Sequence, residues 1–197
     1  MARPLLEGAR AMKRTTRKQR KQRSDARGFT LVELGVVVTI VGILAVVAVV
    51  GYRKMILSSK MTEAKNMIGA IRIAQEDYKA ERGIYYDLAG AGYCPSDGSQ
   101  QKKWAWESSA GGCAAWLQLP VHADGPVQFG YATFAGQTVA QPGQVSPQLM
   151  DLSGYTGKNV PYYVVHAKAD LDGDPTLYTE LAASSFGGNI YTLNEGQ

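Results

Sequence analysis

The residues best placed for chemistry lie near position 30, where one carboxylate enters an otherwise uncharged run. Glu33 follows Gly28 and Phe29, and the residues 34–52 after it carry no charge. An acid at the centre of a lipid-spanning helix costs up to about 3 kcal/mol, and less near its end. Either a cation offsets the charge of Glu33, or its side chain reaches the aqueous boundary of the membrane. The residues alone leave both interpretations open.

The order of residues from 27 to 53 resembles the class III signal of type IV prepilins. A basic segment ends at Arg27 and Gly28, Phe29 opens an apolar helix, and Glu33 lies shortly after it. In that family a prepilin peptidase cuts after the glycine and methylates the new N-terminal residue. The resemblance therefore implies cleavage between Gly28 and Phe29, and an N-methylated Phe29.

The same resemblance implies that Glu33 acts in assembly. Cleavage would leave a cationic amine on Phe29, four residues before Glu33. In a filament of such subunits, Glu33 of one copy faces the Phe29 amine of its neighbour, and the two charges compensate each other inside an apolar bundle. Gly42 also matches the family pattern. Val50 departs from it, because many type IV pilins have a helix-breaking proline there.

Two cysteines, Cys94 and Cys113, follow the apolar run and would lie outside the cytoplasm. In an oxidising compartment such a pair usually forms a disulfide. Closing a loop of this length contributes on the order of 3 kcal/mol to stability in a chain-entropy model. Two unpaired buried thiols are the alternative, and there is no Cys-x-x-Cys redox motif.

The turn Asp170-Leu171-Asp172-Gly173-Asp174-Pro175 is a candidate calcium site. Its carboxylates Asp170, Asp172 and Asp174, at alternate positions, match the beginning of an EF-hand loop. The match ends at Pro175, which replaces the expected glycine, and at Glu180, which falls one place early. Related pseudopilins of secretion systems bind calcium near their last strands. A plain acidic hairpin turn is the favoured alternative, and no other cofactor is expected.

Enzyme motifs are absent from the sequence, which indicates a non-catalytic protein. His122 and His166 are isolated, and we find no Gly-x-Ser-x-Gly elbow, no His-Glu-x-x-His motif and no Gly-rich phosphate loop. Both histidines are interpreted as surface or strand residues.

The basic residues before the apolar run indicate how the chain enters a membrane. Residues 1–28 hold ten Lys or Arg against two acids, whereas the rest holds eleven against fifteen. An excess of Lys and Arg keeps that end in the cytoplasm, so the chain after Tyr52 is expected outside. A nucleic-acid-binding arm is one alternative for this basic segment. A Sec-type signal peptide with a cleavage triplet at 46–48 is another. Neither is preferred, and no nucleic-acid partner is assigned.

Residues 29–83 are predicted to form one long helix with two different halves. In a bilayer only a helix satisfies the hydrogen-bonding groups of its own backbone. A helix over residues 34–52 would be about 28 Å long, just enough to cross the hydrocarbon core. From Leu57 to Tyr78, apolar residues recur at steps of three and four, which is typical of an amphipathic helix. Gly83 then supplies a stop.

The remaining residues are predicted to form a head with a Cys loop and a small sheet. The loop-like stretch 84–126 carries Trp104, Trp106 and Trp116, which are expected to form a small satellite core, with an exposed contact surface as the alternative. The stretch 135–157 is rich in Gly, Gln, Pro and Ser and is expected to run over the surface. Strands are predicted at 127–134, 161–169 and 176–181, with a possible fourth at 189–193; the second and third read as an antiparallel hairpin.

The predicted fold is therefore α+β, with a long N-terminal helix packed on a three- to four-stranded antiparallel sheet, as the resemblance to pilins also implies. Its first half is predicted to be transmembrane and its second half amphipathic. The expected segments are a basic leader (1–28), a membrane and assembly half (29–52), an amphipathic half (53–83) and a head (84–197).

The predicted function is that of a structural subunit of a type IV pilus-like filament. The resemblance implies membrane lipid around the helix before assembly, with the N-terminus cytoplasmic and the head periplasmic at a bacterial inner membrane. Its implied partners are prepilin peptidase, the inner-membrane assembly machinery, other pilins, and copies of itself in a homo-oligomeric filament at the surface or across the periplasm. Such filaments serve adhesion, motility, DNA uptake or secretion.

Two alternatives within the class are a pseudopilin of a type II secretion system and a minor pilin. The alternative from another class is a single-span membrane protein with a periplasmic ligand-binding domain. That domain would bind its ligand through the tryptophans or the Asp turn.

Calcium binding at the Asp turn is open to a direct test. If Asp170, Asp172 and Asp174 hold the ion, calcium should raise the melting temperature of the head, because a ligand that binds only the folded state stabilises it. The measurement is a thermal melt with calcium and then through an EDTA titration. A melting temperature that stays constant throughout would dismiss the site.

Overall fold

The computed structural model describes residues 28–106, 113–174 and 176–195. The basic leader predicted over 1–28 lies outside these residues, apart from Gly28. The chain divides into two compact units, one ending at Leu44 and the other beginning at Ala45.

A single long helix, α1, runs from Leu31 to Arg82. Its C-terminal half carries the predicted amphipathic pattern, which the burial of its side chains confirms. These buried residues are Met61, Ala64, Ile68, Ile71, Ala74 and Gln75. The helix ends where predicted, because Gly83 adopts a left-handed φ of 78° and its N–H donates to the Lys79 carbonyl at 2.7 Å.

Four antiparallel strands form one sheet in the order β1-β2-β3-β4, so the possible fourth strand is present. The strands are β1 (Gly130–Gly136), β2 (Tyr162–Ala169), β3 (Thr179–Ser184) and β4 (Ile190–Leu193). The predicted hairpin is confirmed, with Val165 of β2 opposite Ala183 of β3. Strand β3 begins later than predicted, because the Thr176 amide and hydroxyl both bond to Asp174 and extend the turn.

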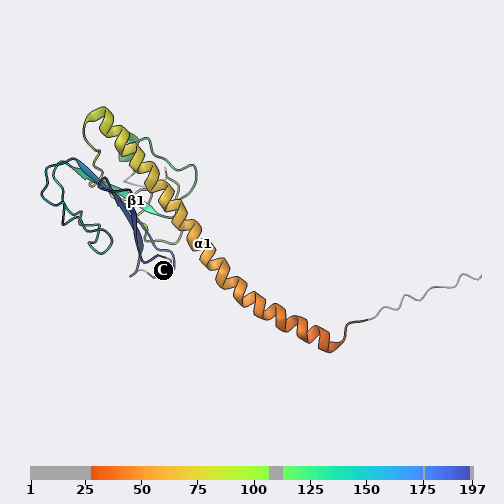
Figure 1. The fold of residues 1–197 in the computed structure, drawn as a ribbon. Coiled ribbons are helices and arrows are strands. Elements are labelled where there is room, and N and C mark those ends of the chain that lie inside the picture. The colour runs from red at the N-terminus through yellow and green to blue at the C-terminus, as the bar shows by residue number, and fades with distance from the viewer. Residues whose placement is uncertain (1–27, 107–112, 175, 196–197) are drawn as a thin grey trace, which may run out of the picture. The chain divides into compact units, whose positions relative to one another are not determined.

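The main core lies between the C-terminal half of α1 and one face of the sheet (Figure 1). Ile68 and Ile71 of the helix belong to one buried cluster with Tyr163 and Val165 of β2 and Leu181 of β3. Burial of an aliphatic or aromatic side chain stabilises a fold by about 1.5–3 kcal/mol. This face therefore fixes the helix on the sheet, and the predicted α+β architecture is confirmed.

The tryptophans do not form a separate satellite core, which corrects the prediction. Trp106 and Trp116 are buried in the main core, with ring centroids 5.4 Å apart and an edge-to-face angle of 76°. Trp104 is half-buried, and its backbone pairs with Val127 in an isolated bridge. The loop that carries them folds back onto the helix and sheet because these large rings have no other apolar surface to cover them.

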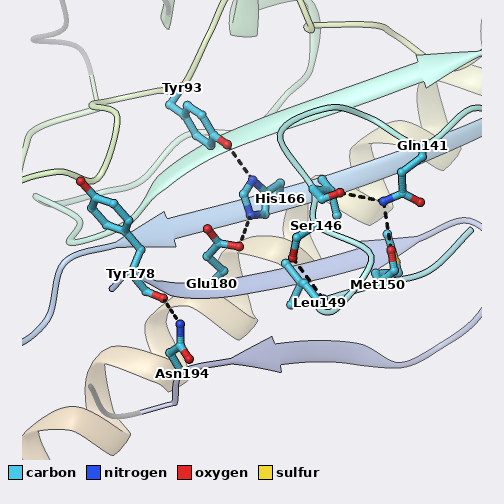
Figure 2. A network of polar contacts seen from close by, with 10 residues as sticks. Tyr93, Gln141, Ser146, Leu149, Met150, His166, Tyr178, Glu180 and Asn194 are labelled. Atoms are coloured by element: carbon cyan, nitrogen blue, oxygen red, sulfur yellow. Dashed lines mark hydrogen bonds and ion pairs between the residues drawn. The ribbon is translucent and has the colours of Figure 1, made fainter. Parts of the chain in front are cut away.

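The stretch 135–157 does not run over the surface, which corrects a second prediction. After the end of β1 it covers the opposite face of the sheet and buries apolar side chains against Val164 and Ala182. Those side chains are Val139, Val145, Leu149, Met150 and Leu152. The side chain of Gln141 holds the stretch together, since its amide donates to the Val145 and Met150 carbonyls and accepts from the Leu152 N–H. Figure 2 shows the contact with Met150.

A buried amide joins the helix to the head. The Gln75 side chain donates to the Tyr86 carbonyl at 2.8 Å and to the Thr133 hydroxyl at 3.1 Å, and it accepts from the Tyr86 N–H at 2.9 Å. Gln75 is fully buried, so its polar atoms would be costly without these partners. The bonds set the position of α1 relative to β1 and to the chain that follows the helix.

The segment after Cys94 packs backbone against backbone on the sheet at Gly98. Gly98 has a left-handed φ of 72°, and a Cβ built there would lie 2.1 Å from the Lys168 carbonyl oxygen. Its own carbonyl accepts from the Asp170 N–H at 2.7 Å. Only glycine fits both the conformation and the space.

Gly98→Ala should therefore destabilise the head by roughly 2–4 kcal/mol, because it combines backbone strain with a collision against a strand. Urea unfolding of the protein in detergent, followed by fluorescence of the buried tryptophans, measures this. Gly154→Ala is the control, since nothing lies within 4 Å of its Cβ position. Equal midpoints for the two variants would contradict the prediction.

Candidate assembly and anchoring site

Helix α1 begins with a capping box built from Thr30 and Glu33. The Glu33 Oε2 atom accepts from the Thr30 N–H at 2.9 Å and from the Thr30 hydroxyl at 2.8 Å. In return the Glu33 N–H donates to the Thr30 hydroxyl oxygen at 3.2 Å. These bonds satisfy N–H groups that have no partner within the helix. The carboxylate is therefore already held by its own chain at the first turn.

Thr30 was missed by the sequence reasoning, although its signal was present. Thr-x-x-Glu ahead of an apolar run is the pattern of a capping box. From the sequence, Glu33 was considered only as an acid in an apolar span. In the structure Glu33 also stabilises the start of the helix.

The predicted cleavage site lies just outside the helix. Gly28 and Phe29 precede α1 without regular structure, and the Phe29 side chain is 88% exposed. No atom lies within 4 Å of a Cβ built on Gly28. The peptide bond between the two residues is therefore accessible without unwinding α1. Their roles in cleavage and methylation stay predictions.

The apolar part of α1 has no partner among the described residues. By length and composition α1 qualifies as a helix that could cross a membrane, and none of its most apolar window is buried. Its small residues Gly35 and Gly42 leave open space at their Cβ positions. The Thr39 hydroxyl donates back to the Gly35 carbonyl at 2.9 Å, so it needs no outside partner. The helix continues without a break through Val50, where many pilins have proline.

Cys94 and Cys113 form the predicted disulfide, with Cα atoms 5.1 Å apart. Cys94 is fully buried, and its backbone pairs with Tyr131 of β1 through two hydrogen bonds of 2.8 and 2.9 Å. Cys113 opens a short 3₁₀ helix, Cys113–Gln118, that carries the buried Trp116. The bridge therefore fastens the tryptophan-bearing loop to the edge of the sheet.

The three carboxylates of the Asp turn are used locally. Asp170 accepts from the Gly173 N–H, Asp172 accepts from the Asp174 N–H, and Asp174 accepts from the amide and hydroxyl of Thr176. The Thr176 bonds hold the pKa of Asp174 below its usual range. Within the described part of the chain, no group of three His, Cys, Asp or Glu side chains is placed to hold a metal. Calcium binding by Asp170, Asp172 and Asp174 stays a prediction.

His166 has a buried polar network that its isolated position in the sequence did not indicate. Its side chain on β2 is 0% exposed, and its Nδ1 lies 2.6 Å from the Tyr93 hydroxyl (Figure 2). Burial raises the pKa of Tyr93, so the phenol stays protonated and is the natural donor to Nδ1. The His166 Nε2 then faces Glu180 at 3.6 Å, beyond hydrogen-bonding distance. The network joins β2 and β3 to the loop before Cys94.

Comparison with known proteins agrees with the site at the start of α1. Residues 23–49 match the family model described as the prokaryotic N-terminal methylation motif. The chain is 38% identical over 102 residues to the type IV major pilin protein PilA of Myxococcus xanthus, covering 50% of this chain and 46% of that protein. It is 40% identical over 67 residues to the fimbrial protein EcpC of Eikenella corrodens, covering 34% of this chain and 44% of that protein. The chain thus spans about half the length of these relatives, and no solved structure matches it.

The fold and the site together define an α+β protein whose N-terminal helix carries a methylation motif and an unburied apolar segment. Over part of its length the chain is therefore similar to a type IV major pilin and to a fimbrial protein.

Replacing both Cys94 and Cys113 by serine should lower the free energy of unfolding of the head by about 3 kcal/mol, because the unfolded chain regains the freedom of the open loop. The two residues are 19 positions apart. Urea unfolding in detergent, compared with the unsubstituted protein, gives the difference. The single variants are the control for a free thiol, and a double variant as stable as the original would show that the bridge adds nothing.

Proposed function

We propose that this chain is a structural subunit of a type IV pilus-like filament, cut between Gly28 and Phe29 by prepilin peptidase and N-methylated at Phe29. One observation carries the proposal: the methylation motif covers the start of α1, where the Gly28–Phe29 bond is accessible and an unburied apolar helix follows. A water-exposed helix of this kind requires either lipid or other helices around it.

The charges at the start of the helix support a role for Glu33 in assembly. Thr30 occupies Oε2 of the carboxylate, and no bond to Oε1 is found within the described residues. Oε1 would accept a hydrogen bond from the amine of a neighbouring subunit's Phe29. In an apolar bundle, the pair would compensate two charges that are each unfavourable alone.

The location and partners follow from the same proposal. Before assembly the subunit lies in the inner membrane, its N-terminus cytoplasmic and its head periplasmic, with the leader (1–28), membrane half (29–52), amphipathic half (53–83) and head (84–197) as separate segments. The inner-membrane machinery then moves it into a filament of copies of itself and other pilins. A pseudopilin of a type II secretion system and a minor pilin share these features, and the chain has no catalytic role in any of them.

The mature N-terminus tests the proposal. Mass spectrometry of protein sheared from the cell surface should find a chain that begins with methylated Phe29. An intact chain beginning at Met1, found only in membranes, would instead favour a single-span anchored protein with a periplasmic ligand-binding domain. Export into the periplasm without surface filaments would favour the pseudopilin.

Glu33→Ala should leave insertion and cleavage largely intact and lower filament yield by tenfold or more, because the neighbour's amine would then be buried unpaired, at roughly 3 kcal/mol or above. Filament yield is measured from sheared material, and cleavage from the mass of the membrane-bound subunit. Glu81→Ala is the control, since Glu81 is an exposed acid near the other end of the same helix. Wild-type yield from Glu33→Ala would rule out charge pairing at this position.

A further inference from the structure

Three cations follow directly on the apolar segment of α1, namely Arg53, Lys54 and Lys60. Arg53 and Lys54 are exposed, and Lys60 is half-buried. Within the part of the chain that the structure describes, none of the three forms an ion pair or a hydrogen bond. The next acid along α1, Glu63, is already paired, because its carboxylate lies 2.7 Å from the Lys103 ammonium. This part of α1 therefore carries positive charge that the head does not neutralise.

Cations at this position act against the proposed orientation of the chain. Lys and Arg favour the cytoplasmic side of a membrane helix, so the outer flank normally holds few of them. Residues 1–28 hold ten Lys or Arg, and this larger number would keep the N-terminus in the cytoplasm. The three cations on the outer flank still oppose insertion and have no partner in the described head. They point to a partner from outside the chain.

The depth of the three cations matches the headgroup layer of a bilayer. Tyr52, which is 66% exposed, lies where aromatic rings mark the edge of the hydrocarbon core. Arg53 and Lys54 follow within about 3 Å along the helix axis, and Lys60 lies about 10 Å beyond Arg53. The headgroup layer of one leaflet is about 5–8 Å thick. The flexible stem of Lys60 covers the remaining distance, so all three charges can lie among lipid phosphates.

Two of the cations lie on one side of α1 with an exposed apolar residue between them. Arg53 and Lys60 are seven residues apart, which places them about 20° from the same direction on the helix. Ile56, which is 39% exposed, lies between them, and Leu57 beside it packs against the main core. Lys54 points about 100° away from Arg53. We call Arg53, Ile56 and Lys60 the cationic strip.

The chemistry of the cationic strip fits an anionic phospholipid. The Arg53 guanidinium can hold two oxygens of one phosphate through paired hydrogen bonds, and Lys60 adds a second positive charge from the other end of the strip. Ile56 offers an apolar contact to the glycerol and the first acyl carbons. An acidic protein surface would match the two charges but not the exposed Ile56. The strip also continues the membrane-spanning segment, so lipid headgroups already lie beside it.

We infer that the cationic strip binds an anionic phospholipid while α1 lies in the membrane. The inference rests on the part of the proposed function that places α1 across a bilayer, and not on cleavage or filament assembly. Each cation near an anionic lipid surface strengthens binding about fivefold. The bound lipid stabilises the membrane-embedded subunit, and the contact is lost when α1 leaves the bilayer.

Lipid retention by the full chain measures this preference. The protein is reconstituted in bilayers that contain both phosphatidylglycerol and phosphatidylcholine, and native mass spectrometry then counts the lipids that stay bound after release. We expect the unsubstituted protein to retain phosphatidylglycerol over phosphatidylcholine by at least about tenfold. Arg53→Gln combined with Lys60→Gln should remove most of that preference.

Arg82→Gln combined with Lys158→Gln is the matched control, because it removes the same charge from two exposed residues outside the strip. This control should keep the preference of the unsubstituted protein. Equal retention of both lipids by the unsubstituted protein, or an equal loss of preference in the control, would overturn the inference. The fold of each variant is checked by a thermal melt in detergent, followed by fluorescence of the buried tryptophans.

A photo-crosslinking amino acid in place of Ile56 identifies the occupant in cells. Mass spectrometry of the irradiated, membrane-bound subunit should find phospholipid adducts at this position. Adducts only with another protein, or only with a second copy, would instead assign the strip to a protein contact and overturn the inference. If the double variant of the strip melts at a lower temperature than the control, this crosslink alone decides.

These outcomes separate the inference from the proposed function. A chain that retains phosphatidylglycerol but is never cleaved or assembled would keep the inference and remove the filament. Methylated filaments from a chain without any lipid preference would do the reverse. A chain found only outside membranes and never in filaments would remove both.

Discussion

The constraint on which the rest of the structure depends is that one helix, α1, must suit two different surroundings. From Leu31 to Val50 its side chains are apolar or small apart from Glu33, and all are exposed, so this part requires lipid or other helices. From Met61 to Gln75 it buries one face against the head. The backbone pattern is the same in both parts. Only the distribution of apolar residues around the helix changes, from all sides to one side.

The head holds the C-terminal half of α1 in place through several independent contacts. Apolar burial against β2 and β3 supplies the bulk of the stability, and directional bonds determine the position. Gln75 holds the helix to the chain that follows it, and Arg72 holds it to the turn before β4. A helix held this firmly on one side leaves its other side as a rigid surface. Rigid surfaces bind partners with less loss of conformational freedom than mobile ones.

The elements that the sequence predicted well are those with a regular period. The amphipathic pattern of α1, its end at Gly83 and the hairpin of β2 and β3 all follow from local residue order, and all are present. The stretch 135–157 was misread because its apolar residues, such as Val139 and Leu149, have no helical or strand period. Its order comes from the Gln141 side chain, which replaces a strand's regular bonds with three bonds of its own.

The same distinction applies to the candidate site. Gly28, Phe29 and Glu33 could be selected as candidates because their order is a short, fixed pattern, and the methylation motif covers that position. Their roles stay predictions. The buried polar network of His166, which does lie on a strand, was not predicted. Its partners Tyr93 and Glu180 come from other parts of the chain and meet only in the folded head. Long-range polar contacts of this kind leave no periodic trace in a sequence.

Thr30 lowers the free-energy cost of placing the Glu33 carboxylate at the start of an apolar helix. An acid at the start of an apolar helix was expected either to pair with a cation or to reach the aqueous boundary of the membrane. Two hydrogen bonds from Thr30 already stabilise the carboxylate in the single chain. Charge-assisted capping bonds of this kind contribute about 1 kcal/mol. The cost of holding the acid at the end of an apolar segment is therefore reduced before any partner arrives. In the proposed filament, pairing would then have to compensate mainly the charge of the neighbour's amine, which the bonds from Thr30 leave unchanged.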